Sequence, residues 1–171
     1  IACGLTSAPD DLDPQAVTTV NLHGNFIRQL GTSLSSLTKL VTLNLSSNHI
    51  EAVEGLGALS QLRTLNLACN KIAKVEGLSG LVALRSLDLS HNLVSDVSGF
   101  YELDAESSAL AEVRLKDNLI SAVRDLLPLR SAGKLSLLEL ESGHFTNPLC
   151  DLPSYHKDVL HLLPQVRVLD P

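Results

Sequence analysis

One pattern of apolar and polar positions recurs six times along the chain. It runs apolar, two variable, apolar, one variable, apolar, two variable, asparagine, one variable, apolar. The copies begin at Val17, Leu40, Leu62, Leu84, Leu110 and Leu135. Successive asparagine positions are 23, 22, 22, 26 and 25 residues apart, and in the last, degenerate copy Gly143 stands in place of asparagine. So regular a period predicts stacked copies of one structural unit.

The alternation within each copy predicts a short β-strand. Apolar residues two positions apart, such as Leu43 and Leu45, point to the same face of a strand because side chains alternate between its two faces. One strand per unit of roughly 20–29 residues is typical of the leucine-rich repeat. We therefore expect an α/β fold, a curved leucine-rich repeat solenoid of about six repeats with short parallel strands on its concave face.

The asparagine that follows each strand has a structural explanation. Where the backbone turns away from the sheet, buried N–H and C=O groups would be left unpaired, at a cost of about 1–3 kcal/mol each. A carboxamide donates and accepts hydrogen bonds at once, so asparagines on adjacent turns are expected to form a structural ladder rather than a catalytic group. The ladder residues are Asn25, Asn48, Asn70, Asn92 and Asn118.

A solenoid has two apolar ends that must be covered. We predict a single domain, residues 1–171, with an N-terminal cap at 1–16, repeats at 17–146 and a C-terminal cap at 147–171. Within the second cap, Ser154 is expected to begin a helix that Pro164 ends. The stretch VRVLD that follows is strand-like. The first and last residues suggest a fragment of a longer protein.

Composition and charge exclude several function classes. The formal net charge is −6 without any cluster of lysine and arginine, which argues against a nucleic-acid partner. No apolar stretch approaches the roughly 18 residues of a membrane span, so we expect no membrane partner. The three cysteines, Cys3, Cys69 and Cys150, are odd in number and far apart, which is typical of reduced thiols.

No constellation of residues predicts catalysis. Cys150, His156 and His161 are close in sequence but lack the paired spacing of a zinc site. Cys69 and His91 occupy equivalent places in adjacent repeats, without an evident oxyanion hole or orienting acid. We therefore expect no enzyme activity, no cofactor and no metal.

Two sets of residues carry a family resemblance. The return segments with Glu-Gly-Leu at 54–56 and 76–78, and the run from Asn147 to Asp170, resemble the phosphatase-regulator subclass of leucine-rich repeats and its C-terminal cap motif. A closer resemblance, to the leucine-rich-repeat and coiled-coil centrosomal protein family (variable flagella protein in algae), covers nearly the whole chain. It is carried by the stretched fourth spacing and by GLTS, VNLHGNFI, LNLSSNHI, LNLACNKIAKVEGL and LLELESGHFTNPLCDLP.

The closer resemblance implies a function. It implies a non-enzymatic scaffold in the cytoplasm and cytoskeleton, at the centriole or basal body of the centrosome, involved in centriole asymmetry and cilium or flagellum assembly. Its partners would be centriolar or other cytoskeletal proteins, and a coiled coil would follow the repeats. The isolated domain would be a monomer and the parent protein a dimer through that coiled coil. The alternative is an axonemal dynein light-chain-like or phosphatase-regulator-like subunit.

Three surfaces are candidates for partner binding. On the concave face the N-terminal half is small and neutral, whereas the C-terminal half is charged, and it is either a solvated sheet face or a binding site. We call its residues the charged cluster: Asp88, Glu112, Arg114, Lys116, Glu139 and Glu141. Beside the ladder, Leu93 and Leu119 form a possible apolar patch. The acidic insert at 99–112 contains Tyr101, either part of a longer helical return segment or a partner anchor. We expect Arg114→Glu to abolish binding without changing the melting temperature.

Overall fold

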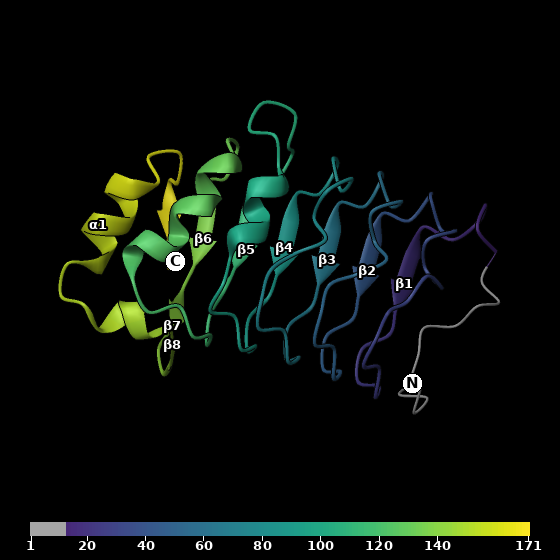
Figure 1. The fold of residues 1–171 in the computed structure, drawn as a ribbon, viewed down its shortest axis with the longest axis horizontal. Helices are drawn as coiled ribbons and strands as arrows, with labels where there is room; N and C mark the ends of the chain where they lie inside the picture. The colour runs from purple at the N-terminus through teal and green to yellow at the C-terminus, as the bar shows by residue number, and fades with distance from the viewer. Residues whose placement is uncertain (1–12) are drawn as a thin grey trace.

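The structure is a computed structural model that describes residues 13–171. It is a solenoid whose seven-stranded sheet has the order β1-β2-β3-β4-β5-β6-β9, with every neighbouring pair parallel (Figure 1). The strands are β1 Thr19–Asn21, β2 Thr42–Asn44, β3 Thr64–Asn66, β4 Ser86–Asp88, β5 Glu112–Arg114, β6 Leu137–Glu139 and β9 Val168–Leu169. The predicted leucine-rich repeat solenoid is thus confirmed. Residues 1–12 of the predicted N-terminal cap lie outside the described part of the chain.

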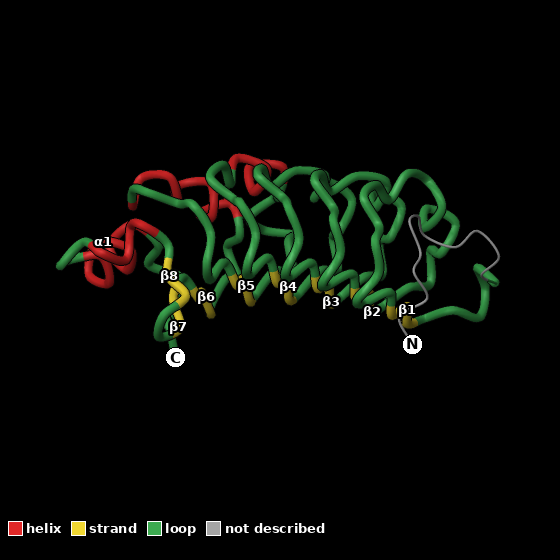
Figure 2. Tube along the Cα trace, turned by 90° about the horizontal axis from the view of Figure 1, so that it is seen from below, coloured by secondary structure: helices red, strands yellow, loops and turns green. Residues whose placement is uncertain are grey.

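The helical turns of the return segments lie on the side of the solenoid opposite the strands, and the last helix lies at its C-terminal end (Figure 2). Figure 2 shows this arrangement and a row of strands that bows, so that the strand side is concave. Three are 3₁₀ helices, η1 Ser98–Glu102, η2 Val123–Ser131 and η3 Pro148–Asp151, and one is an α-helix, α1 Tyr155–Leu162. All four lie in the later repeats and the cap, where the spacing between repeats is longest. The longer return segments are thus the ones that contain helical turns.

The core is a stack of aliphatic side chains. The middle residue of each three-residue strand is buried, as in Leu43, Leu65 and Leu87, because it alone points away from the concave face. Phe100 is the largest fully buried side chain. A core made of many similar leucine and valine contacts is what the low aromatic content of 3% predicts.

Glycines allow adjacent return segments to pack closely. Gly55 and Gly77 have φ values of +72° and +70°, and a Cβ at either would collide with a backbone carbonyl oxygen of the preceding repeat. The colliding atoms belong to Gly31 and Val53 respectively. A side chain at these turns would therefore force adjacent repeats apart.

The C-terminal cap consists of η3, α1 and β9. Tyr155, Val159 and Leu163 are buried, and β9 extends the sheet by pairing with β6. Ser154 precedes the helix as predicted, but its hydroxyl donates to the Asp158 carboxylate at 2.6 Å and makes no cap hydrogen bond to the backbone. The expected strand-like stretch is confirmed at Val168–Leu169.

Candidate protein-interaction site

The ladder asparagines join adjacent repeats through their buried carboxamides. Asn70 donates from Nδ2 to the carbonyl of Leu67 in its own repeat, at 2.9 Å, and to that of Leu45 in the preceding repeat, at 3.0 Å. Its Oδ1 accepts the N–H of Ile50 at 2.9 Å. Asn48, Asn92 and Asn118 make the equivalent bonds. Asn25, in the first repeat, donates to Leu22 O at 2.9 Å.

The sixth rung of the ladder is Asn147. It is fully buried, donates to Leu115 O and Leu140 O at 2.7 and 2.8 Å, and accepts the N–H of Ile120 at 3.1 Å. The prediction that Gly143 occupies the asparagine position of the sixth repeat was wrong. A two-stranded hairpin, β7 Glu141–Ser142 and β8 Phe145–Thr146, separates Leu140 from its asparagine, so the distance is 7 residues instead of the 3 between Leu115 and Asn118.

The strand register aligns the concave side chains in columns. Asn21, Asn44, Asn66, Asp88, Arg114 and Glu139 face one another in the central column, as their Cα pairing shows. Thr19, Thr42, Thr64, Ser86, Glu112, Leu137 and Val168 form the column before it. The charged cluster is therefore contiguous, and it lies between β4 and the beginning of β7 at the C-terminal end of the face.

Arg114 is at the centre of the charged cluster. Its Nε lies 3.1 Å from Glu139 Oε1, and its Nη2 lies 3.3 Å from Glu112 Oε2. It also donates from Nη1 to Ser86 Oγ at 3.2 Å. Lys116 pairs with the second oxygen of Glu139. Glu139 holds the two bases in place through these ion pairs. Because it is only 8% exposed, it presents little surface to a partner.

Two acids of the cluster have no basic neighbour within ion-pair distance among the described residues. Asp88 Oδ1 accepts the backbone N–H of Ser90 at 2.9 Å, and its side chain is half-buried. Glu141 accepts a hydrogen bond from the Tyr155 hydroxyl, which is neutral. Asp88 therefore contributes a carboxylate without an ion-pair partner among the described residues to the concave face, whereas the Glu141 carboxylate is hydrogen-bonded to the cap.

The predicted apolar patch is exposed but narrow. Leu93 and Leu119, which follow the ladder asparagines of adjacent repeats, are 48% and 51% exposed. Phe26 is also exposed and lies 5.8 Å from the His49 ring, while Lys71 lies between that pair and Leu93 along the ladder edge. The ladder edge is therefore interrupted, with two apolar side chains at its C-terminal end.

Phe145 is an exposed aromatic residue that sequence reasoning missed. Its ring lies 4.9 Å from the His91 ring at an interplanar angle of 81°, and it is 50% exposed. His91 in turn lies 2.9 Å from Asp117 Oδ2 through its Nδ1. The β7–β8 hairpin of the sixth repeat thus contacts the fourth repeat, and only the four extra residues before Asn147 could have indicated it.

The insert presents Tyr101 to solvent. Tyr101 is 58% exposed within η1. The adjacent Glu102 carboxylate has a structural role, because its Oε2 accepts the backbone N–H groups of Leu78 and Ser79 at 3.0 and 2.9 Å. The Glu102 carboxylate of the insert therefore joins two adjacent return segments.

One group of side chains in the cap has the composition of a metal site. Glu141, His156 and Asp170 place ligand atoms within 4.8 Å of one another. The Tyr155 hydroxyl, however, lies 3.0 Å from both His156 Nε2 and Asp170 Oδ2 and also binds Glu141. Asp170 Oδ1 already accepts the backbone N–H groups of Leu140 and Glu141. The tyrosine oxygen thus fills the space between the ligands, and the group fixes the cap to the last repeat.

Burial raises two pKa values in this cap. The pKa of the Cys150 thiol rises to about 11, mainly because the thiol is buried and also because Asp170 and Glu141 repel a thiolate. Burial likewise raises the pKa of Tyr155 far above its ordinary value, and its hydrogen bonds to Glu141 and Asp170 add to the effect. A thiol held protonated in this way is a poor nucleophile.

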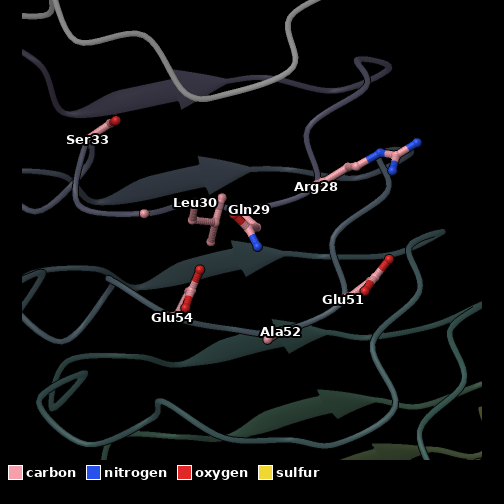
Figure 3. Close-up of a pocket in the computed structure, with 8 residues that line it drawn as sticks. Arg28, Gln29, Leu30, Ser33, Glu51, Ala52 and Glu54 are labelled. Carbon is pink, nitrogen blue, oxygen red and sulfur yellow. The ribbon is translucent and has the colours of Figure 1, made fainter.

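The pocket shown in Figure 3 is a surface depression between the first two return segments. Arg28 and Glu51 lie at one end and Ser33 at the other, so the polar groups are spread along the rim and do not converge on a common point. Its other lining residues are Gln29, Leu30, Gly31, Ala52 and Glu54. This arrangement lacks the convergent polar groups of a small-molecule site.

In the described part of the chain, the structure contains no helix with the length and apolar character of a membrane span.

Comparisons with known proteins agree with this architecture. The chain matches the leucine-rich repeat family over residues 19–171, and no curated protein matches it. It is 33% identical to TLR13 in a TLR13–ssRNA13 complex, with a TM-score of 0.67, covering 77% of this chain and 19% of that one. It is 24% identical to a chain of the Drosophila melanogaster SNF/U2A′ complex, with a TM-score of 0.60, covering 97% and 84%. It is 19% identical to the internalin inlF of Listeria monocytogenes, with a TM-score of 0.61, covering 91% and 48%.

The two structures with lower sequence identity share the fold alone, and the chain spans about a fifth of the length of TLR13. The family match covers nearly all of the residues that the structure describes. The chain belongs to the leucine-rich repeat family.

Proposed function

We propose that this domain is a non-enzymatic scaffold that binds another protein across the C-terminal half of its concave face. The observation that carries the proposal is the charged cluster, which follows an N-terminal half whose paired strand positions on the concave face are threonine and asparagine. Solenoids bind partners on such extended concave surfaces, and the leucine-rich repeat fold is consistent with a protein-interaction scaffold. Proteins of this family are typically non-enzymatic interaction modules.

The arrangement of the charged cluster favours recognition over a purely structural role. Arg114 and Lys116 are fixed by Glu139 and still keep about a quarter of their side-chain surface exposed, 28% and 25%. Side chains that are already ordered lose less conformational entropy when a partner binds. The U2A′ structure comes from a complex with the protein SNF, which supports a protein partner for this chain as well.

The proposed cellular setting is the centriole or basal body, in centriole asymmetry and in cilium or flagellum assembly. The support is the resemblance to the centrosomal coiled-coil family, which is carried mainly by the longer fourth and fifth repeats. The second candidate is an axonemal dynein light-chain-like or phosphatase-regulator-like subunit. It is favoured by the Glu-Gly-Leu return segments and the cap, which that subclass shares.

Localisation separates the two settings. The protein should be tagged at its own locus in a ciliated cell and imaged by expansion microscopy together with centriole and axoneme markers. A signal confined to the centriole or basal body is expected. A signal along the axoneme, or in the nucleus, would contradict the centriolar proposal and support a sister family with the same repeat architecture.

A further inference from the structure

The chemistry of the charged cluster identifies the kind of partner. Building on the proposed function, we propose that the bound segment of the partner protein is basic, and that Phe145 receives one of its arginine or lysine side chains. The argument rests on the charge balance of the concave face, on the position of the β7–β8 hairpin and on the exposure of one aromatic ring.

The concave face has an excess of negative charge at its C-terminal end. The cluster contains four acids, Asp88, Glu112, Glu139 and Glu141, and two bases, Arg114 and Lys116, so its formal charge is −2. Both bases are already paired, with Glu139 and Glu112. Within residues 13–171, Asp88 has no ion-pair partner, and the Glu141 carboxylate is hydrogen-bonded to the neutral Tyr155 hydroxyl, so cations of a partner would balance the excess charge of the cluster.

The N-terminal half of the face offers no competing charge. Its columns contain Thr19, Thr42 and Thr64 beside Asn21, Asn44 and Asn66, all of them neutral. The excess of negative charge on the face therefore lies at its C-terminal end, where Glu139 in β6 and Glu141 at the start of β7 are both acidic. Such an uneven distribution of charge would attract the basic part of a partner to one end of the solenoid and set the orientation in which it binds.

The β7–β8 hairpin forms a wall at that end. Figure 2 shows the hairpin standing out beyond the row of strands, on the side away from the helices. Glu141 begins the hairpin and Phe145 lies in its second strand, paired with Ser142. A chain that crosses the charged cluster therefore meets the hairpin next.

Phe145 is suited to contact a cation. Half of its surface is exposed although the ring is fixed against His91. The face of an aromatic ring attracts lysine and arginine side chains, and the attraction increases when water is excluded. An exposed ring on the hairpin that borders the acidic end of the concave face thus favours a basic partner segment over an acidic one. The negative charge of the cluster would repel the phosphates of a nucleic acid.

The test uses two fluorescent synthetic peptides of equal length, one containing arginines and leucines and the other with every arginine replaced by glutamate. Each is titrated with the full 171-residue chain, at low and at physiological ionic strength. The basic peptide should bind, its affinity should fall with added salt, and the acidic peptide should not bind.

Two pairs of matched variants locate the site. Asp88→Asn combined with Glu141→Gln should weaken binding of the basic peptide by about fivefold or more. Asp104→Asn combined with Glu106→Gln removes the same charge from the exposed insert and should leave binding unchanged. Phe145→Ala should weaken binding, whereas Phe26→Ala, at an equally exposed phenylalanine, should not. Equal weakening by both double variants, or equal binding of both peptides, would overturn the inference.

The proposed function can fail separately from this inference. If a cellular partner cross-links to concave positions but is unaffected by added salt and by the Asp88 and Glu141 variants, the concave site stands and the basic partner is wrong. If no partner contacts the concave face at all, the proposed function fails first, whatever the peptides do.

Discussion

Arg114 and Glu139 form an ion pair across adjacent strands, with 3.1 Å between Nε and Oε1, and the glutamate is 8% exposed. The pair therefore contributes to the stability of the folded domain as well as to the charged surface of the concave face. This geometry argues against the expectation that Arg114→Glu leaves the melting temperature unchanged, because the variant would place a third carboxylate between Glu112 and Glu139.

We predict that Arg114→Gln lowers the free energy of unfolding by about 1–2 kcal/mol, because Glu139 loses a charged partner while it stays largely buried. Urea unfolding followed by circular dichroism measures the change. Adding Glu139→Gln to this variant should recover part of the loss. Glu112→Gln, at a more exposed carboxylate, should cost less than about 0.5 kcal/mol. Equal losses for Arg114→Gln and Glu112→Gln would contradict the assignment.

The ladder makes a second prediction. Asn70→Ala removes the partners of Leu45 O, Leu67 O and the Ile50 N–H, so it should lower stability by about 2–4 kcal/mol. The control is Asn66→Ala on the concave face. Among the described residues, the Asn66 side chain accepts a hydrogen bond only from the nearby Ala68 N–H, so its loss should cost less than about 1 kcal/mol. Similar melting temperatures for the two variants would refute the ladder.

Backbone packing between return segments makes a third prediction. Gly77→Ala combines a φ of +70° with a collision against Val53 O, and should cost about 2 kcal/mol or more. Gly31→Ala has a φ of +55° and open space around its Cβ, so it should cost only about 1 kcal/mol of backbone strain. Thermal unfolding of the two variants separates collision from strain, and a larger loss at Gly31 would contradict this account.

The cap predicts how stability depends on pH. The pKa of Cys150 is raised from 9.0 to about 11 in the folded chain, so the unfolded thiol loses its proton at lower pH. Stability should therefore fall as pH rises from 9 to about 11. Cys150→Ala should reduce this slope, measured as the free energy of unfolding across that range. Tyr155, whose pKa is also raised, acts in the same direction above pH 10, so some slope should remain. An unchanged slope in Cys150→Ala would show that the thiol is not the source.

The repeat period was sufficient to predict the strands and the concave columns. The middle residue of each three-residue strand points into the core and its two neighbours point to the concave face, so the positions of Leu43, Leu65 and Leu87 determine the register of the sheet. The final strand at Val168–Leu169 followed from the same alternation. These features are local and repetitive, and for that reason the sequence alone predicts them.

Other features depend on contacts that spacing cannot encode. The repeat pattern did not identify Asn147 as a ladder residue because the hairpin adds four residues between Leu140 and Asn147. The equivalent spacing in the fifth repeat, between Leu115 and Asn118, is 3 residues, whereas here it is 7. The same hairpin places Phe145 on His91, a contact between the sixth and the fourth repeats. Glu139 is buried where it pairs with Arg114 and Lys116 of the preceding repeat, which is again a contact between repeats.

The most direct test of the account compares the three surfaces in one experiment. A photo-crosslinking amino acid is placed at Asp88 in the charged cluster, at Leu119 on the ladder edge, or at Tyr101 on the insert, and the protein is irradiated in the cell in which it is expressed. The account predicts a specific cross-linked protein from position 88 and none from positions 119 and 101. Cross-links from 119 or 101 with none from 88 would contradict it.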